Sequence, residues 1–206
     1  MNLSLKARNQ PVLATLLLWN LAVLYVALAS KTHDWTQLGA IPALWQKALL
    51  PAGVVVIAVG ILTEQFGPEW KARIVFWKWR DPLPGSVAFT EIGPSDARVD
   101  MADLKIRCGP FPDAPADQNR AWYKLYKSVE TQPTIVAPHK SYLLYRDYTV
   151  LSLLLLLSAI PLALWYQLAV LPAGLLAAVL LIQYLLARNA ARIAGRRLVG
   201  SVLANC

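Results

Sequence analysis

Residues 148–187 read YTVLSLLLLLSAIPLALWYQLAVLPAGLLAAVLLIQYLLA, and none of these 40 side chains carries a charge. As one helix the run would reach roughly 60 Å, about twice the hydrocarbon thickness of a bilayer. It therefore predicts two membrane spans, Tyr148–Trp165 and Leu168–Ala187, joined by a tight turn at Trp165-Tyr166-Gln167. Tryptophan and tyrosine settle at the membrane–water boundary, which favours a turn at this position.

Two further apolar segments precede this run. Residues 9–30 are rich in Leu, Val and Ala, and residues 48–63 are rich in Val, Ile, Ala and Gly. Lys6 and Arg8 ahead of the first segment also fit a signal peptide, which stays open as an alternative, but the apolar stretch is longer than such a peptide needs. We therefore expect four transmembrane helices.

The expected fold is an all-α membrane protein with its four transmembrane helices in two hairpins. Residues 1–63 would form the first hairpin and residues 148–187 the second. Residues 64–147 would form a small, mainly helical cytoplasmic domain between helices 2 and 3, and residues 188–206 a basic cytoplasmic tail.

The distribution of Lys and Arg predicts the orientation. Residues 64–147 hold 12 basic and 11 acidic residues, and the tail after residue 187 holds four arginines and no acid. Because basic residues gather on the cytoplasmic side, we expect both termini and the middle domain in the cytoplasm. Most of the net charge of +8 thus flanks spans, so nucleic acid is not an expected partner.

Polar and small residues inside the spans bear on assembly. Asn20 and Gln183 would either bond between packed helices, the reading we favour, or line a pore or fix an oligomer. The expected spans hold no acidic, basic or histidine side chain, which argues against an ion-coupled carrier. Small residues at helical spacing let helices approach closely and predict helix packing and a homo-oligomer; they are Gly53, Gly60, Ala169, Ala173 and Ala177.

Basic and aromatic residues interleave beside the spans. Such a pattern can bind nucleic acid, but beside a membrane it favours contact with lipid headgroups. The expected membrane-interface residues are Trp70, Lys71, Arg73, Trp77, Lys78, Trp79, Arg80, Arg188, Arg192, Arg196 and Arg197. We expect the last four on a separate tail helix at the inner leaflet, with Leu198, Val199, Val202 and Leu203 as its apolar contact.

The middle segment predicts three helices. One lies between Ser95 and Arg107, capped by Ser95 or Asp96. A second is capped by Asp113, has Pro115 early in its first turn, and carries an apolar stripe of Trp122, Leu125, Tyr126 and Val129. The third begins at Pro138 and runs without interruption into the third span.

Seven polar or aromatic residues of this segment are candidates for binding a partner or an anionic or planar ligand: Gln118, Asn119, Trp122, Tyr123, His139, Arg146 and Asp147. The alternative is that they cap and pack. No Cys/His cluster, Gly-rich phosphate loop or nucleophile–base signature occurs, so we predict no metal, no cofactor and no catalytic residue. Cys108 and Cys206 should be reduced thiols on the cytoplasmic side.

In the arrangement of its spans and of the domain between spans two and three, the chain resembles small bacterial multi-pass inner-membrane proteins of antiviral defence systems. The resemblance implies a homo-oligomeric effector or signalling subunit, not an enzyme, whose cytoplasmic domain receives a protein partner or ligand and acts on the lipid bilayer. The resemblance does not identify functional residues in this chain. A membrane anchor for a cytoplasmic enzyme is the first alternative, and a lipid-active enzyme using Asp117, His139 and Asp147 is the second.

Overall fold

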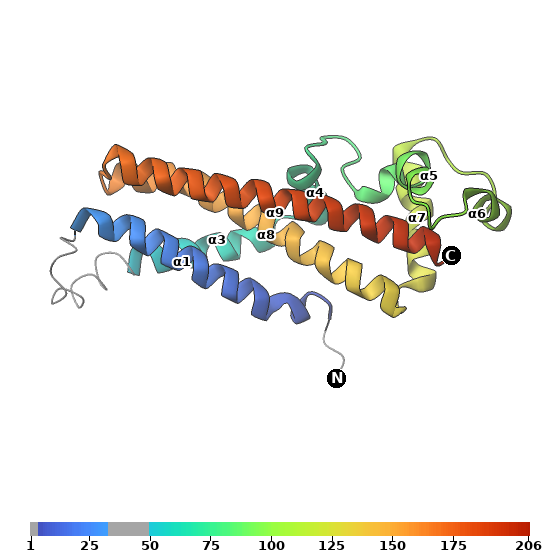
Figure 1. Ribbon diagram of the computed structural model, residues 1–206, viewed down its shortest axis with the longest axis horizontal. Coiled ribbons are helices and arrows are strands. Elements are labelled where there is room, and N and C mark those ends of the chain that lie inside the picture. Colours follow the sequence, from blue (N-terminus) through green and yellow to red (C-terminus); the bar gives the residue numbers. More distant parts are fainter. Residues whose placement is uncertain (1–3, 33–49) are drawn as a thin grey trace. The chain divides into compact units, whose positions relative to one another are not determined.

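The computed structural model describes residues 4–32 and 50–206, and over these residues the chain is helical and contains no strand. A short turn, η1 (Ala7–Asn9), comes first, and η4 (Pro84–Val87) and the π-helical turn η5 (Ala88–Ile92) precede α5. The helices are α1 (Gln10–Thr32), α3 (Leu50–Gln65), α4 (Pro68–Phe76), α5 (Gly93–Ser95), α6 (Met101–Cys108), α7 (Pro115–Val129), α8 (Pro133–Trp165) and α9 (Val170–Ala204) (Figure 1).

The chain divides into two units. The apolar unit comprises Gln10–Phe66 and Asp147–Ala187, and the helical domain comprises Met1–Asn9, Gly67–Arg146 and Arg188–Cys206. Helices α8 and α9 therefore each contribute residues to both units.

Three helices of the described residues, α1, α8 and α9, are long and apolar enough to cross a membrane, and a fourth span results if α3 and the following α4 are counted together. The chain is thus all-helical and compatible with membrane insertion. Most of the segment between the first two expected spans, residues 33–49, lies outside the described residues.

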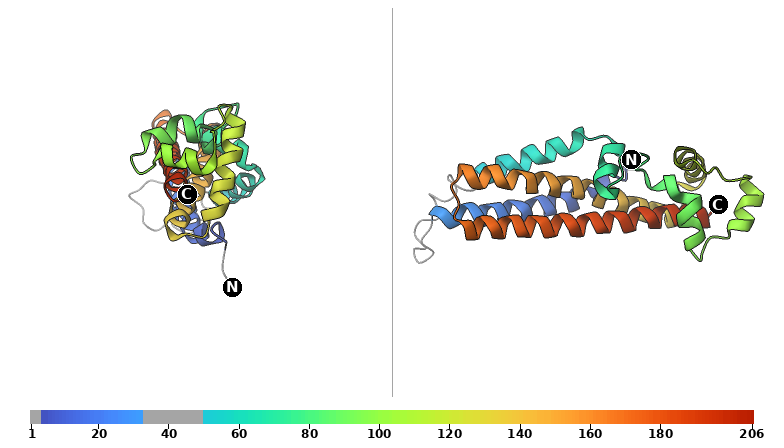
Figure 2. Two further views of the ribbon diagram at one scale, coloured as in Figure 1. Left: turned by 90° about the vertical axis from the view of Figure 1, so that its right-hand side faces the viewer. Right: turned by 90° about the horizontal axis from the view of Figure 1, so that it is seen from above.

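The predicted turn after Trp165 is confirmed. Helix α8 ends at Trp165 and α9 begins at Val170. Gln167 adopts the left-handed conformation at φ 48°, and the Leu168 amide donates back to the Ala163 carbonyl at 2.9 Å. Within the apolar unit, α8 and α9 consequently run side by side in opposite directions (Figure 2).

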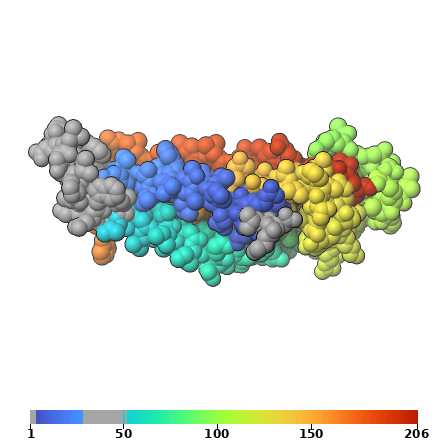
Figure 3. Space-filling model, turned by 90° about the horizontal axis from the view of Figure 1, so that it is seen from below, coloured from blue at the N-terminus to red at the C-terminus, as the bar shows by residue number. Residues whose placement is uncertain are grey.

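Helix α1 packs against α3 in the apolar unit (Figure 3). A polar contact joins three of its helices, because Gln183 Nε2 donates to Asn20 Oδ1 at 2.9 Å and to Ser152 Oγ at 3.2 Å. Asn20 and Ser152 are fully buried. The bond between packed helices that the sequence favours for Asn20 and Gln183 is therefore present.

The small residues of the apolar unit are not closely packed against the neighbouring helices that the structure describes. Nothing beyond neighbouring backbone in the described residues lies within 4 Å of a β-carbon placed on Gly53 or Gly60. Ala169 is exposed and precedes α9, while Ala173 and Ala177 are half-buried. These positions therefore remain open to lipid or to another chain.

The core of the helical domain is built from α7 and from the ends of α8 and α9. The predicted stripe of α7 is confirmed, since Trp122, Tyr126 and Val129 are buried and Leu125 packs against them. Helix α8 adds Ile135 and Tyr142 to this cluster.

The separate tail helix expected at the membrane is wrong. Residues 188–204 are the last turns of α9, and the side chains expected to contact lipid are buried in the core of the domain. A segment as short as the domain buries little apolar surface alone, so it takes up this face of α9. The buried side chains are Leu198, Val199, Val202 and Leu203.

The predicted starts of three helices are also wrong. Helix α6 begins at Met101, with Asp100 as its N-cap accepting bonds from the Ala102 and Asp103 amides. The N-cap of α7 is Ala114, although Pro115 does occupy its first turn. Helix α8 does run without interruption into the apolar segment, but it begins at Pro133, five residues earlier than expected.

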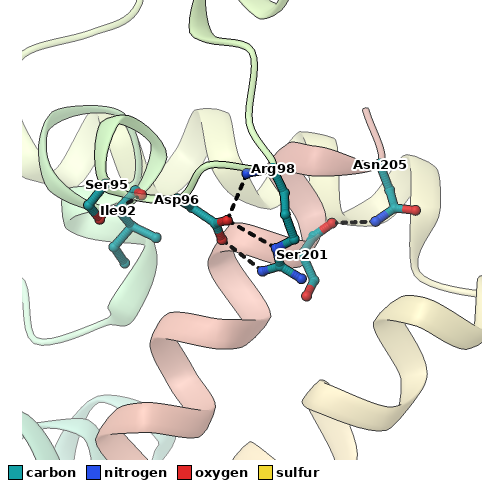
Figure 4. A network of polar contacts seen from close by, with 6 residues as sticks. All are labelled: Ile92, Ser95, Asp96, Arg98, Ser201 and Asn205. Atoms are coloured by element: carbon teal, nitrogen blue, oxygen red, sulfur yellow. Dashed lines mark hydrogen bonds and ion pairs between the residues drawn. The ribbon is translucent and has the colours of Figure 1, made fainter.

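Asp96 does not cap a helix as expected, but pairs with Arg98. Its carboxylate accepts from Arg98 Nη2 at 2.7 Å and from Arg98 Nε at 3.0 Å. The pair lies beside the end of α9, where Gly200 leaves room because a β-carbon would overlap the Asp96 carboxylate (Figure 4). The Arg98 guanidinium lowers the pKa of Asp96 from its ordinary value.

Candidate ligand-binding site

The end of α4 has an unusual backbone. Trp77 caps the helix in the left-handed conformation at φ 54°, and its amide donates to the Arg73 carbonyl. Asp81 adopts a second left-handed conformation at φ 46°. Non-glycine residues adopt this region at a cost of about 1–2 kcal/mol, and such strain gathers at functional sites. The turn between them presents Lys78, Trp79 and Arg80.

Side chains of α4 hold this turn in place. Arg73 Nε donates to the Trp79 carbonyl at 3.2 Å, and the Arg73 guanidinium lies 4.5 Å from the centre of the Trp70 ring. The Trp70 and Trp79 rings meet edge to face at 6.3 Å. Arg73 is also 3.8 Å from Glu69, at the outer limit of an ion pair. These contacts fix an exposed aromatic ring among cations.

A cleft of about 490 Å³ opens between this turn and α7. Its wall on α7 includes Asn119 and Arg120, and its wall on the turn includes Trp79, Arg80 and Asp81. Arg120 is paired with Asp117 at 3.1 Å, whereas no ion pair of Arg80 occurs within the described residues. The lining holds three arginines, Arg73, Arg80 and Arg120, and two acids, Glu69 and Asp81, and Asp117 beside Arg120 balances the third arginine.

Gly85 brings α7 close to this turn. A β-carbon at residue 85 would lie 2.6 Å from Asn119 Oδ1 and 2.7 Å from Trp122 Cε3. Only glycine leaves space for both side chains, and this packing holds Asn119 at the rim of the cleft. Trp122 itself is buried in the core, and its indole nitrogen has no hydrogen-bond partner among the described residues.

Gln118 is a buried connector, not a cleft residue. It is 1% exposed, and its Oε1 accepts from the Phe89 amide at 3.1 Å while its Nε2 donates to the Asp113 carbonyl at 3.0 Å. It thereby ties the π-helical turn η5 to the start of α7. Of the four candidates on α7, only Asn119 lines the cleft, while Gln118 and Trp122 pack and Tyr123 is exposed beside Tyr126.

The remaining candidates lie elsewhere. His139 Nδ1 is 3.0 Å from the Tyr126 hydroxyl, whose pKa is raised by burial, and Arg146 lies over the Tyr142 ring at 5.8 Å. Asp147 is 2% exposed and belongs to the apolar unit. The residues of the lipid-active alternative thus have different partners, because Asp117 pairs with Arg120 and His139 with Tyr126.

The tail arginines face outward from the core. Arg188 lies over the Trp77 ring, with its guanidinium carbon 3.4 Å from the ring centre, and Arg196 is 3.9 Å from Glu91. Arg192 and Arg197 are exposed. Lys71, expected at the membrane interface, is instead buried at 3% exposure.

The sequence does not indicate Arg120 or Asp81, which both line the cleft, as ligand contacts. Arg120 has Asp117 three positions earlier, a spacing that usually indicates an ion pair on the solvated face of a helix. This spacing gives no sign that Arg120 also lines a cleft. Asp81 precedes a proline, which indicates a turn but not a left-handed backbone.

Within the described residues, no group of three or more His, Cys, Asp or Glu side chains gathers as a metal site would require. Comparisons with protein-family models, with curated proteins and with solved structures find no match for this chain.

Proposed function

We propose that this chain is a homo-oligomeric membrane protein whose helical domain receives an anionic, planar ligand in the cleft between Trp79 and Asn119 and acts on the bilayer in response. In this proposal the protein has four spans, both termini and the domain lie in the cytoplasm, and the membrane is a bacterial inner membrane. A role in antiviral defence follows only from the resemblance in span arrangement.

Helices α8 and α9 are the main support. Each contributes an apolar segment to one unit and core side chains to the domain that bears the cleft. Tyr142 of α8 and Leu198 of α9 are both buried in that core. A ligand that changes the packing of the domain therefore acts on the helices that carry the apolar segments.

The cleft favours a ligand that combines negative charge with a flat ring. Arginine binds phosphate and carboxylate groups through paired hydrogen bonds, and Trp79, which is 73% exposed, offers a face for stacking. Asn119 adds an amide at the rim. A nucleotide is the simplest probe with both properties.

Ligand binding is tested by thermal unfolding of the full-length protein in an uncharged detergent. ATP should raise the unfolding temperature more than pyrophosphate does, because only ATP can stack on Trp79. At ten times its dissociation constant a ligand adds about 1.4 kcal/mol to the stability. Trp79→Ala and Arg80→Gln should each remove the shift, and Lys105→Gln, on α6, should retain it. Equal shifts with ATP in all variants would contradict the cleft as the site.

Action on the bilayer is tested with liposomes that contain the protein and an encapsulated dye. We expect an oligomer by crosslinking and a release of dye. Ala173→Leu should weaken both, because a larger side chain on a half-buried position pushes helices apart. A monomer in liposomes that retain their dye would contradict this proposal and would favour a membrane anchor for another protein.

A further inference from the structure

A second hollow of the helical domain gathers three cations from distant parts of the sequence. It measures about 220 Å³ and is lined by Lys78, Arg192 and Arg196. Lys78 follows α4, while the two arginines lie on α9. Pro82, Leu83 and Ser86 line both this hollow and the cleft described above, so they form a shared wall.

The charge in this hollow is not balanced. Glu91 is its one acidic lining residue, and it lies 3.9 Å from Arg196, with both side chains about half exposed (52% and 49%). An ion pair this long and this exposed contributes little. No ion pair of Lys78 or Arg192 occurs within the described residues. Two positive charges therefore remain in one small hollow, where they repel each other unless an anion binds.

Packing of the end of α4 against α9 brings these cations together. The Phe76 ring lies against Gly195, where a β-carbon would be 3.0 Å from Phe76 Cζ. One residue later, the Trp77 ring lies against Arg188. These two contacts hold the end of α4 on α9, so that Lys78 lies next to the face of α9 that carries Arg192.

The arginines are positioned by the helix itself. Arg188, Arg192 and Arg196 are spaced four residues apart, so they lie on one face of α9. The side of α9 turned away from these arginines carries Ala194 and Leu198, which are buried in the domain core. The cations are thus held before any ligand arrives, which lowers the entropy lost on binding.

The walls of the hollow favour a compact anion. Phe76, Val87 and Ile92 provide apolar surface, next to which charge–charge attraction is stronger than in open water. The volume is several times the roughly 30 Å³ that one water occupies, so a phosphoryl group with some of its hydration fits. Arginine binds phosphate in paired hydrogen bonds, and lysine adds a point charge.

We propose that Lys78, Arg192 and Arg196 form a binding site for a phosphoryl group. Its source is either the headgroup of an anionic phospholipid or a soluble phosphate compound, and both present the same chemistry to these cations. The site is separate from the cleft at Trp79 and stands without the function proposed above.

The test uses the full-length protein in an uncharged detergent, with three probes. These are phosphatidic acid, phosphatidylcholine and inorganic phosphate, and the readouts are the unfolding temperature and retained lipid in native mass spectrometry. Phosphatidic acid or inorganic phosphate should stabilise the wild type, and phosphatidylcholine should not. Displacement of retained phosphatidic acid by millimolar inorganic phosphate identifies a soluble source, and its retention identifies the lipid headgroup.

Charge-matched variants decide whether the site is specific. The double variant Lys78→Gln/Arg192→Gln should weaken binding of the effective probe at least tenfold. Lys105→Gln/Lys124→Gln, which removes two exposed lysines elsewhere on the domain, should change it less than twofold. Equal losses in the two double variants, or no binding of either phosphate probe to the wild type, would overturn the proposal. Folding of each variant is checked by its unfolding temperature without probe.

Discussion

The ring of Phe76 lies against Gly195, and a β-carbon at residue 195 would approach its Cζ to 3.0 Å. The Tyr142 ring also lies close, at 3.2 Å from the same position. This contact joins α4, α8 and α9 within the helical domain and places Lys78 beside the arginines of α9.

Gly195→Val should destabilise the domain by about 1–3 kcal/mol, the usual scale of overpacking, because a larger side chain displaces the Phe76 and Tyr142 rings. The measurement is the free energy of unfolding in detergent. Phe76→Ala creates space at the same point, so the double variant should be less destabilised than the sum of the singles. Strictly additive effects would show that the two residues do not share this contact.

Gln118→Met should cost about 1–3 kcal/mol of stability. Methionine has a similar volume but leaves the Phe89 amide and the Asp113 carbonyl without their buried partner. Lys124→Met, on the exposed side of α7, should change stability by no more than about 0.5 kcal/mol. Similar effects of the two substitutions would mean that Gln118 does not connect η5 to α7.

Asn20 and Gln183 should be coupled inside the apolar unit. Asn20→Leu and Gln183→Met each remove their bond, and the double-mutant cycle should give a coupling of about 0.6 kcal/mol, the average for such bonds between membrane helices, and no more than about 1.7 kcal/mol. Stability against unfolding in mixed micelles provides the measurement. A coupling near zero, together with a loss of dye release, would instead place these side chains in a pore.

Stability should fall in acid through Asp96. Its folded-state pKa lies below the ordinary value of 3.8, chiefly because Arg98 donates to it. The unfolded chain therefore binds the proton first as the pH falls, so the stabilisation is complete above pH 3.8 and is lost as the pH drops through the folded pKa. Asp96→Asn and Arg98→Gln should both flatten the stability curve below about pH 4. Parallel curves for wild type and Asp96→Asn would contradict this assignment.

The sequence predicts most of the fold where one physical effect dominates. Forty uncharged residues and the turn at Trp165 leave few alternatives for α8 and α9, and the stripe at Trp122, Tyr126 and Val129 identifies the buried face of α7. The predicted contact of the tail with the membrane surface is wrong because a helix with basic and apolar residues suits a membrane surface and the edge of a protein core equally well. Only tertiary packing decides between these two environments.

The candidate site was predictable only in part. Asn119, Trp79 and Arg80 are recognisable as exposed polar or aromatic residues beside turns. The role of Gly85 and Gly195 depends on which helices meet, and the left-handed backbone of Asp81 has no signal in its side chain. Lys78 and Arg192 line the same hollow although they are more than a hundred residues apart in the sequence. No local sequence pattern indicates that they meet.

In the proposed topology the helical domain lies in the cytoplasm of a cell whose membrane holds the apolar helices. The native thiols allow a direct test, because Cys108 is exposed whereas Cys206 is half-buried with a pKa raised by burial. In a Cys206→Ser variant, a membrane-impermeant maleimide should label Cys108 only after the cells are permeabilised. Gln167→Cys, at the turn between α8 and α9 in a variant without native cysteines, should be labelled in intact cells. Labelling of Cys108 in intact cells, with position 167 protected, would show that the helical domain lies outside the cytoplasm.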